Sequence, residues 1–120
     1  EYKYYWKSGE LQYTRKYGDG VMQGEYKYYH YKSENLRYTV NYVDGLIQGE
    51  WKGYYKSGEL YYTEIFIDGV RQGETKTYYK SGNLKYTVNY VDDLKQGEWK
   101  FYYESGELES TRNYIDGVEQ

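Results

Sequence analysis

The residues that could carry out catalysis are few, and most of them recur at a fixed spacing. The chain has one histidine, His30, which could act as a base. Five of its six serines occupy the same place in a repeated pattern, at Ser8, Ser33, Ser57, Ser81 and Ser105. Catalysis needs one nucleophile, one base and an orienting group within reach of each other. Because no copy differs from the others in this way, the pattern favours a turn role for the serines, and we expect no catalytic residue and no enzyme activity.

Aspartates that precede glycine could bind Ca²⁺, which takes several oxygen ligands from alternate positions of one loop. Here each repeat has one such aspartate, and only Asp92–Asp93 places two acids together. A tight turn requires Asp and Gly for its backbone conformation alone. The absence of cysteine also removes any thiolate site or disulfide framework. We therefore expect no metal and no cofactor.

Lysines that alternate with tyrosines are typical of nucleic-acid surfaces, where cations meet phosphates and rings stack on bases. The formal net charge of −3 argues against this, so we expect no nucleic-acid partner. A weaker hypothesis is that a row of lysines meets an acidic partner or anionic lipid headgroups. We favour a simpler interpretation, in which this face is only solvated and a recurring glutamate supplies a cross-strand counter-charge. The row consists of Lys3, Lys27, Lys52, Lys76 and Lys100.

The regular spacing of these residues comes from an internal repeat of about 24 residues. Units of this kind bury their apolar faces on their neighbours. We treat the 120 residues as one array and expect it to be a block of a longer protein, because it begins in mid-pattern without a methionine. The predicted repeats are 1–24, 25–49, 50–73, 74–97 and 98–120.

Each repeat contains two short runs that are rich in aromatic and β-branched residues. In the third repeat these are Trp51–Tyr55 and Leu60–Phe66, joined by a K-S-G-E turn in which Gly58 takes positive φ. A longer D-G-V-R-Q-G turn leads to the next repeat, and no segment has helical periodicity. The sequence therefore predicts an all-β fold: an elongated, single-layer antiparallel β-meander of five hairpin repeats and about ten strands, spanning about 50 Å.

Two places break the repeat. The second repeat has one extra residue around Tyr28–Tyr31, which we interpret as a β-bulge in the strand, and Glu34 stands where the other turns have glycine. The fourth repeat has Asp93 in place of the glycine of the D-G turn. Because Asp tolerates the left-handed region better than most residues, we expect this turn to survive.

Alternation of side chains along each strand predicts two different faces. In the third repeat we place Leu60 on an aromatic face and Lys52, Tyr54 and Thr63 on the other. Apolar surface of this extent usually marks a contact site. The candidate binding face comprises Tyr2, Tyr4, Trp6, Tyr13, Tyr17, Tyr38, Tyr42, Trp51, Tyr55, Tyr62, Phe66, Tyr86, Tyr90 and Trp99.

The string G-E-W-K-x-Y-Y-x-S-G-x-L, followed by Y-x-D-G-x-x-x-G, resembles the MORN repeat in its variant form, as found in bacterial YwqK-type antitoxin-like proteins. The matching positions include the aromatic pair Tyr54 and Tyr55, the turn glycine Gly58 and the closing glycine Gly73, and they recur along the whole chain. The resemblance implies an elongated single-layer sheet that contacts other proteins or membrane lipid.

Our first hypothesis is a non-enzymatic scaffold that binds another protein, with membrane lipid as a further possible partner. Self-association through an open sheet edge or the tyrosine-rich face is also expected. The alternative is a carbohydrate- or choline-binding array at a bacterial cell surface, because such aromatic repeats use Trp-rich cages. The chain has three tryptophans, Trp6, Trp51 and Trp99, and they do not share one repeat position. A continuous ring ladder would favour the scaffold, and Trp cages would favour the alternative.

Overall fold

The computed structural model describes all residues from 1 to 120, and every regular element in it is a β-strand. No helix is present that has the length and apolar character needed to cross a membrane. The strands are β1 (Tyr2–Tyr5), β2 (Leu11–Arg15), β3 (Tyr17–Gly18), β4 (Val21–Met22), β5 (Gly24–Tyr29), β6 (Leu36–Val43), β7 (Leu46–Ile47), β8 (Gly49–Tyr54), β9 (Leu60–Ile67), β10 (Val70–Arg71), β11 (Gly73–Tyr78), β12 (Leu84–Val91), β13 (Leu94–Tyr102), β14 (Leu108–Ile115) and β15 (Val118–Glu119).

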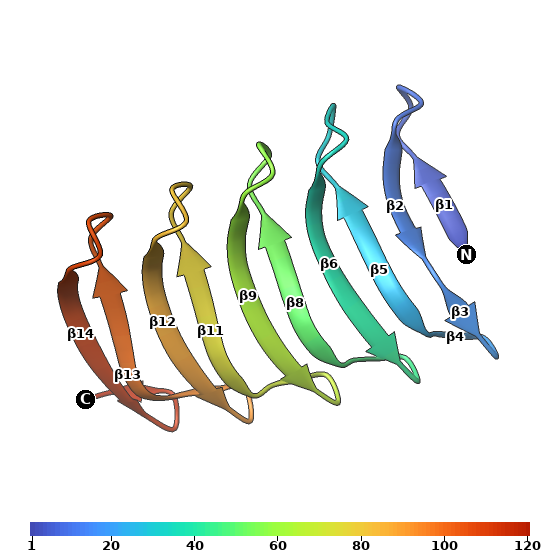
Figure 1. Cartoon of the computed structure of the whole chain (residues 1–120). Helices are drawn as coiled ribbons and strands as arrows, with labels where there is room; N and C mark the ends of the chain where they lie inside the picture. Colours follow the sequence, from blue (N-terminus) through green and yellow to red (C-terminus); the bar gives the residue numbers. More distant parts are fainter.

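The long strands form one antiparallel sheet in the order in which they occur along the chain, so the all-β meander is confirmed. Figure 1 shows five successive hairpins side by side, with the two ends of the chain at opposite ends of the sheet. The principal extents are 45 × 32 × 18 Å, close to the length expected from strand spacing. One margin of the sheet carries the serine-containing turns, here the Ser-turn margin, and the other carries the D-G turns, here the Asp-turn margin (Figure 1).

Each D-G turn is tighter than the sequence suggested, because the residues after it form a short strand of their own. In the third repeat β10 pairs back onto the end of β9, with Val70 opposite Ile67. Asp68 and Gly69 both have positive φ, at 51° and 82°. Two consecutive positive φ values define the type I′ hairpin turn, which favours Asp-Gly. Asp93 adopts φ 68° in the fourth repeat, so that turn survives its substitution as expected.

A β-bulge occurs in every hairpin, not only in the second repeat. In the third, Gly53 pairs with Tyr62 but Tyr54 pairs with Leu60, so Tyr61 is the extra residue. The bulge reverses the alternation, and the placement of Leu60 on the aromatic face was therefore wrong. In the second repeat the equivalent Leu36 lines a hollow on the opposite face, together with Lys27, Lys52 and Tyr54.

The extra residue of the second repeat lies in the turn and not in the strand. β5 pairs with β6 in the same register as its equivalents, including Tyr29 opposite Leu36. The turn that follows is closed by a bond from the His30 N–H to the Asn35 carbonyl, whereas the first turn closes from Trp6 to Glu10, one residue shorter. The left-handed residue of this enlarged turn is Lys32, at φ 55°, and Glu34 is not in that conformation.

Candidate interaction face

One face of the sheet carries a nearly continuous ladder of aromatic rings, here the aromatic face. Cross-strand neighbours place these rings in contact, and aromatic pairs of this kind stabilise a sheet beyond their buried area. Burial raises the pKa of the Tyr38 and Tyr62 hydroxyls above the usual value of a tyrosine. The rings follow in the order Tyr4, Tyr13, Tyr28, Tyr38, Trp51 and Phe66, at centroid distances of 4.4, 6.1, 5.3, 5.0 and 5.9 Å.

The ladder stops at β11 and resumes beyond it. β11 faces this side with Thr75 and Thr77, both less than 10 % exposed, where β13 has Trp99 and Phe101. Beyond the gap, Trp99 lies 5.6 Å from Tyr86, 5.1 Å from Phe101 and 5.8 Å from Tyr114, between ring centroids. The aromatic face therefore consists of a long ladder over the first three repeats and a shorter cluster over the last two.

Two of the predicted face residues, Trp6 and Tyr55, lie at the rim of the sheet, because β1 ends at Tyr5 and β8 ends at Tyr54. The Tyr55 hydroxyl donates to the Tyr78 carbonyl of the next repeat over 2.6 Å, and Tyr79 does the same to Tyr102 over 2.7 Å. Trp6 meets the edges of Tyr28 and Tyr31 at 6.1 and 5.2 Å. These side chains join neighbouring repeats along the Ser-turn margin.

Cations of the chain itself cover parts of the aromatic face. Arg15 lies 4.8 Å from the centre of the Tyr4 ring, and its Nη2 donates to the Tyr4 hydroxyl over 2.8 Å. Lys95 lies 4.0 Å from the Trp99 ring and Arg71 lies 4.3 Å from the Tyr90 ring. Cation–π contacts at such distances are attractive, so these parts of the face already have a partner within the chain.

The opposite face carries the predicted lysine row, and three of its five lysines are paired along their own strand. Lys27 lies 3.3 Å from Glu25, Lys52 lies 3.4 Å from Glu50, and Lys76 forms the equivalent pair with Glu74 at 3.5 Å. The predicted counter-charge is therefore present, but the expectation that it lies across strands was wrong. Paired lysines leave little net positive charge to attract acidic headgroups.

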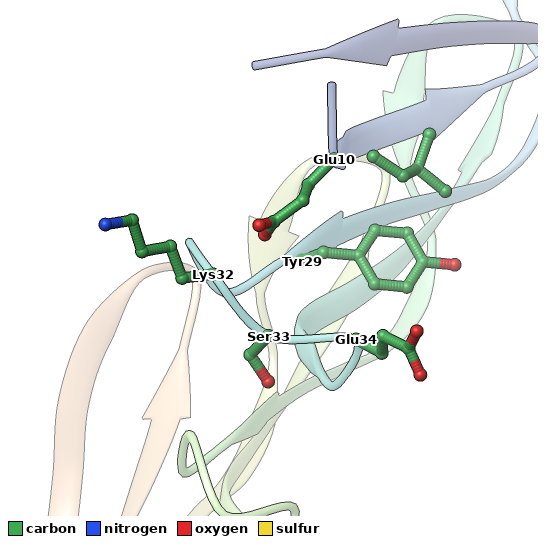
Figure 2. Close-up of a pocket in the computed structure, with 6 residues that line it drawn as sticks. Glu10, Tyr29, Lys32, Ser33 and Glu34 are labelled. Atoms are coloured by element: carbon green, nitrogen blue, oxygen red, sulfur yellow. The ribbon is translucent and has the colours of Figure 1, made fainter. Parts of the chain in front are cut away.

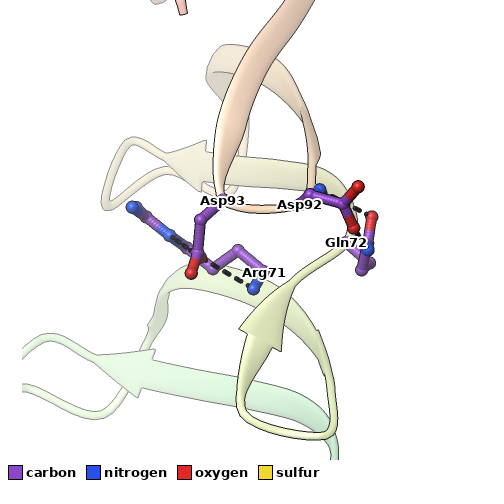
Figure 3. Close-up of polar contacts among 4 residues, drawn as sticks. All are labelled: Arg71, Gln72, Asp92 and Asp93. Carbon is purple, nitrogen blue, oxygen red and sulfur yellow. Dashed lines mark hydrogen bonds and ion pairs between the residues drawn. The ribbon is translucent and has the colours of Figure 1, made fainter. Parts of the chain in front are cut away.

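The Asp-turn margin joins each repeat to the next through a side-chain hydrogen bond. The Gln23 amide donates to the Asp44 carboxylate over 2.6 Å, and the other three junctions repeat this contact. At the third junction, Asp93 also accepts hydrogen bonds from the Arg71 backbone N–H at 2.9 Å and its Nε at 3.2 Å (Figure 3). These aspartates thus hold the repeats together, and no group of three or more potential ligand residues is placed to hold a metal ion.

A hollow of about 480 Å³ lies beside the enlarged turn of the second repeat. Figure 2 shows Glu10, Tyr29, Lys32, Ser33 and Glu34 around it. Both carboxylates and the ammonium belong to exposed side chains, and the one contact among them is that of the Lys32 Nζ with the Tyr31 ring, 5.6 Å from its centroid. This hollow follows from the length of the turn and has no set of groups that converge on a ligand.

Several residues of the aromatic face were missed from the sequence. The repeat position held by Trp51 and Trp99 also carries Tyr26, and the position two residues later carries Tyr28 and Phe101. Aligning the five copies by the position of Trp51 would have revealed them. The charged residues among the rings, such as Arg15 and Glu64, give a weaker signal, because sequence patterns place charges on the solvated face.

The structure thus defines a class: a tandem array of β-hairpins with one aromatic face and linked margins. The family described as MORN repeat variant matches residues 47–68, 71–92 and 95–116, more than half of the chain, and the protein belongs to this family. MORN repeats are generally repeat modules of binding and scaffold proteins and take part in protein or membrane interactions. No curated protein matches the chain.

Proposed function

We propose that this protein is a non-enzymatic scaffold that binds another protein through its aromatic face. The observation that carries the proposal is the ring ladder from Tyr4 to Phe66, which presents partly exposed apolar surface over three repeats. Large apolar patches on a soluble protein mark contact surfaces, and aromatic side chains dominate the energetics of protein interfaces.

The charges favour a protein over a lipid surface. Three of the five lysines in the row opposite the rings pair with glutamates, and the cations on the aromatic face contact rings or carboxylates. Membrane binding through headgroups requires clusters of free basic residues. The tryptophans also favour the scaffold over a sugar or choline array, because Trp51 and Trp99 belong to separate parts of the ladder and Trp6 lies in a turn.

The test is site-specific photo-cross-linking in cells that make the protein. We expect a photoreactive phenylalanine at Tyr38 to give a discrete adduct with a protein. The same group at Ile65, which lies on the opposite face and is 39 % exposed, should give none. A charged substitution at the neighbouring Tyr26 should remove the Tyr38 adduct. Adducts from Ile65 alone, or adducts of Tyr38 with lipid only, would refute docking of a protein on this face.

We also infer that residues 1–120 act as one array with the five repeats predicted from the sequence. The inter-repeat hydrogen bonds at both margins support this division. The narrower similarity to bacterial YwqK-type antitoxin-like proteins stays a hypothesis, supported by the S-G-x-L and D-G strings, each of which occurs in four of the five repeats.

A further inference from the structure

The gap in the ring ladder at β11 forms a hollow of about 230 Å³ on the aromatic face. Thr75 and Thr77 form its floor, and Tyr62 and Tyr86 form its two walls. Both walls are cross-strand neighbours of Thr77, one on each side. Since strands are spaced ~4.8 Å apart, the two backbones that carry these rings are roughly 10 Å apart.

The two walls lean away from the gap and keep it open. The Tyr62 ring lies over Gly53, so close that a side chain at Gly53 would collide with it. The Tyr86 ring leans toward Trp99 and Phe101, at 5.6 and 5.7 Å. The space between the two rings is therefore open, and a flat group that enters it can lie against one of them.

The hollow also contains a carboxylate that has no partner. Glu64 lies on the aromatic face opposite Trp51, and it makes no ion pair and no hydrogen bond within the chain. Burial raises the pKa of Glu64, and the charge of Arg71 only partly offsets this effect. A half-buried carboxylate without a partner favours a cationic ligand, because pairing would restore the interactions that the carboxylate has lost from water.

The position equivalent to Glu64 carries a cation of the chain itself in two other repeats. It holds Arg15 in the first repeat and Arg112 in the last, each beside a ring of this face. The nearest internal cation to Glu64 is Arg71, but its guanidinium bonds Asp93 and covers Tyr90. The central repeat is therefore the place where rings, hydroxyls and an acid converge without a cation of the chain.

We propose that this hollow binds the guanidinium group of an arginine from the protein partner, placed between Tyr62 and Tyr86 and paired with Glu64. The inference rests on the proposed function, because it names one residue of the partner that docks on the aromatic face. A guanidinium is flat, stacks on rings and pairs with a carboxylate through two parallel N–H donors. Its remaining N–H groups point toward the Thr75 and Thr77 hydroxyls at the floor. A lysine ammonium is a compact point charge, so it cannot lie flat against a ring or donate two parallel N–H bonds to the carboxylate.

The test uses the 120-residue chain and three short peptides, Ac-Gly-Arg-Gly-NH₂ and its lysine and citrulline analogues, followed by NMR titration. The arginine peptide should shift the Thr75 and Thr77 methyl signals and the Glu64 amide. Citrulline has the same shape without the charge, and both it and the lysine peptide should bind at least about tenfold more weakly. Equal binding of the lysine peptide would overturn the assignment to arginine.

Two variants place the interaction in the hollow. Glu64→Gln removes the charge and should weaken arginine binding by about tenfold or more, whereas Glu74→Gln on the opposite face should not change it. Thr75→Trp introduces the residue found at the equivalent Trp51 and Trp99, so it has precedents in this fold, and it should fill the hollow and abolish binding. Arginine binding that survives both variants would refute the site.

The Tyr38 cross-link separates this inference from the proposed function. If Glu64→Gln leaves the protein adduct at Tyr38 intact and no arginine peptide binds, the hollow is not an arginine site and the scaffold function stands. If Tyr38 gives no protein adduct, the scaffold function fails, whatever the peptides do.

Discussion

The ring of Tyr62 covers the backbone of Gly53, its cross-strand partner, and occupies the space that any side chain at position 53 would need. The equivalent position carries Tyr28 in the second repeat and Phe101 in the last, where rings stand upright beside their neighbours. Glycine at this one copy lets Tyr62 lie flat and leaves open the space above Thr77.

Replacement of Gly53 by alanine should therefore move the Tyr62 ring toward Thr77. Forcing extra atoms into a packed site costs about 1–3 kcal/mol, so we expect a loss of this size in the free energy of unfolding. Denaturant unfolding measures the loss, and NOE contacts between Tyr62 and the Thr77 methyl report the movement. An unchanged Tyr62 position with unchanged stability would show that Gly53 has no such role.

The hydrogen bonds between Gln72 and Asp92 can be tested with two matched substitutions at the Asp-turn margin. Gln72 both donates to the Asp92 carboxylate and accepts from the Asp92 N–H, the latter over 3.0 Å (Figure 3). Gln72→Ala should reduce the free energy of unfolding by about 1 kcal/mol. Gln120→Ala is the control, because the Gln120 amide donates only to the Val118 carbonyl. Equal effects on the melting temperature would mean that the inter-repeat bond contributes nothing.

The corrected position of Leu60 changes what its removal should do. Because Leu60 is half-buried on the face opposite the rings, Leu60→Ala should cost about 2 kcal/mol, at the low end for such truncations. The near-UV circular dichroism of the ring ladder should stay the same. Lys52→Ala on the same face loses only an exposed ion pair and should cost less than about 1 kcal/mol. A change in the near-UV circular dichroism of Leu60→Ala would indicate that Leu60 lies on the aromatic face after all.

The raised pKa of Glu64 predicts a pH-dependent difference between the wild type and Glu64→Gln. A carboxyl whose pKa is higher in the folded state stabilises that state below its unfolded pKa, and this contribution is lost as pH rises through the folded pKa. Glu64→Gln should thus gain stability relative to the wild type between pH 3.5 and pH 7. Melting temperatures at the two pH values measure the gain, and a variant that loses stability over this range would refute the burial argument.

The exposed strand β1 predicts self-association. Tyr2 and Tyr5 are 54 % and 57 % exposed, and one side of the strand has no hydrogen-bonded neighbour. Open strand edges pair with other chains. Sedimentation should show association of the wild-type chain that increases with concentration, whereas a variant with Tyr2→Asp and Tyr4→Asp should remain monomeric. If both sediment as monomers at high concentration, the edge is not adhesive.

The repeat period and the turn residues were enough to predict the fold, because Gly58 and the D-G pairs define where each strand must reverse. The faces were predicted less well. Strict alternation holds only in a regular strand, and the bulge at Tyr61 reverses it, which placed Leu60 on the wrong side. The candidate binding face remains a prediction as a binding site. The hollow at its centre could not be predicted from the sequence. It exists because Thr75 and Thr77 are small residues that lie among the rings of neighbouring strands, and only the three-dimensional structure shows this arrangement.

The order of the hairpins in the sheet also determines how the protein would respond to force. Its two ends lie at opposite ends of the sheet, so tension between them runs across the strands and along the backbone hydrogen bonds (Figure 1). Bonds loaded in this direction open one after another, as in a zipper, and do not share the load. Each detached repeat of about 24 residues would lengthen the chain by roughly 70 Å, from about 10 Å stacked to about 80 Å extended. The protein would therefore yield in equal steps at low force, as an extensible tether whose step length is fixed by its repeat.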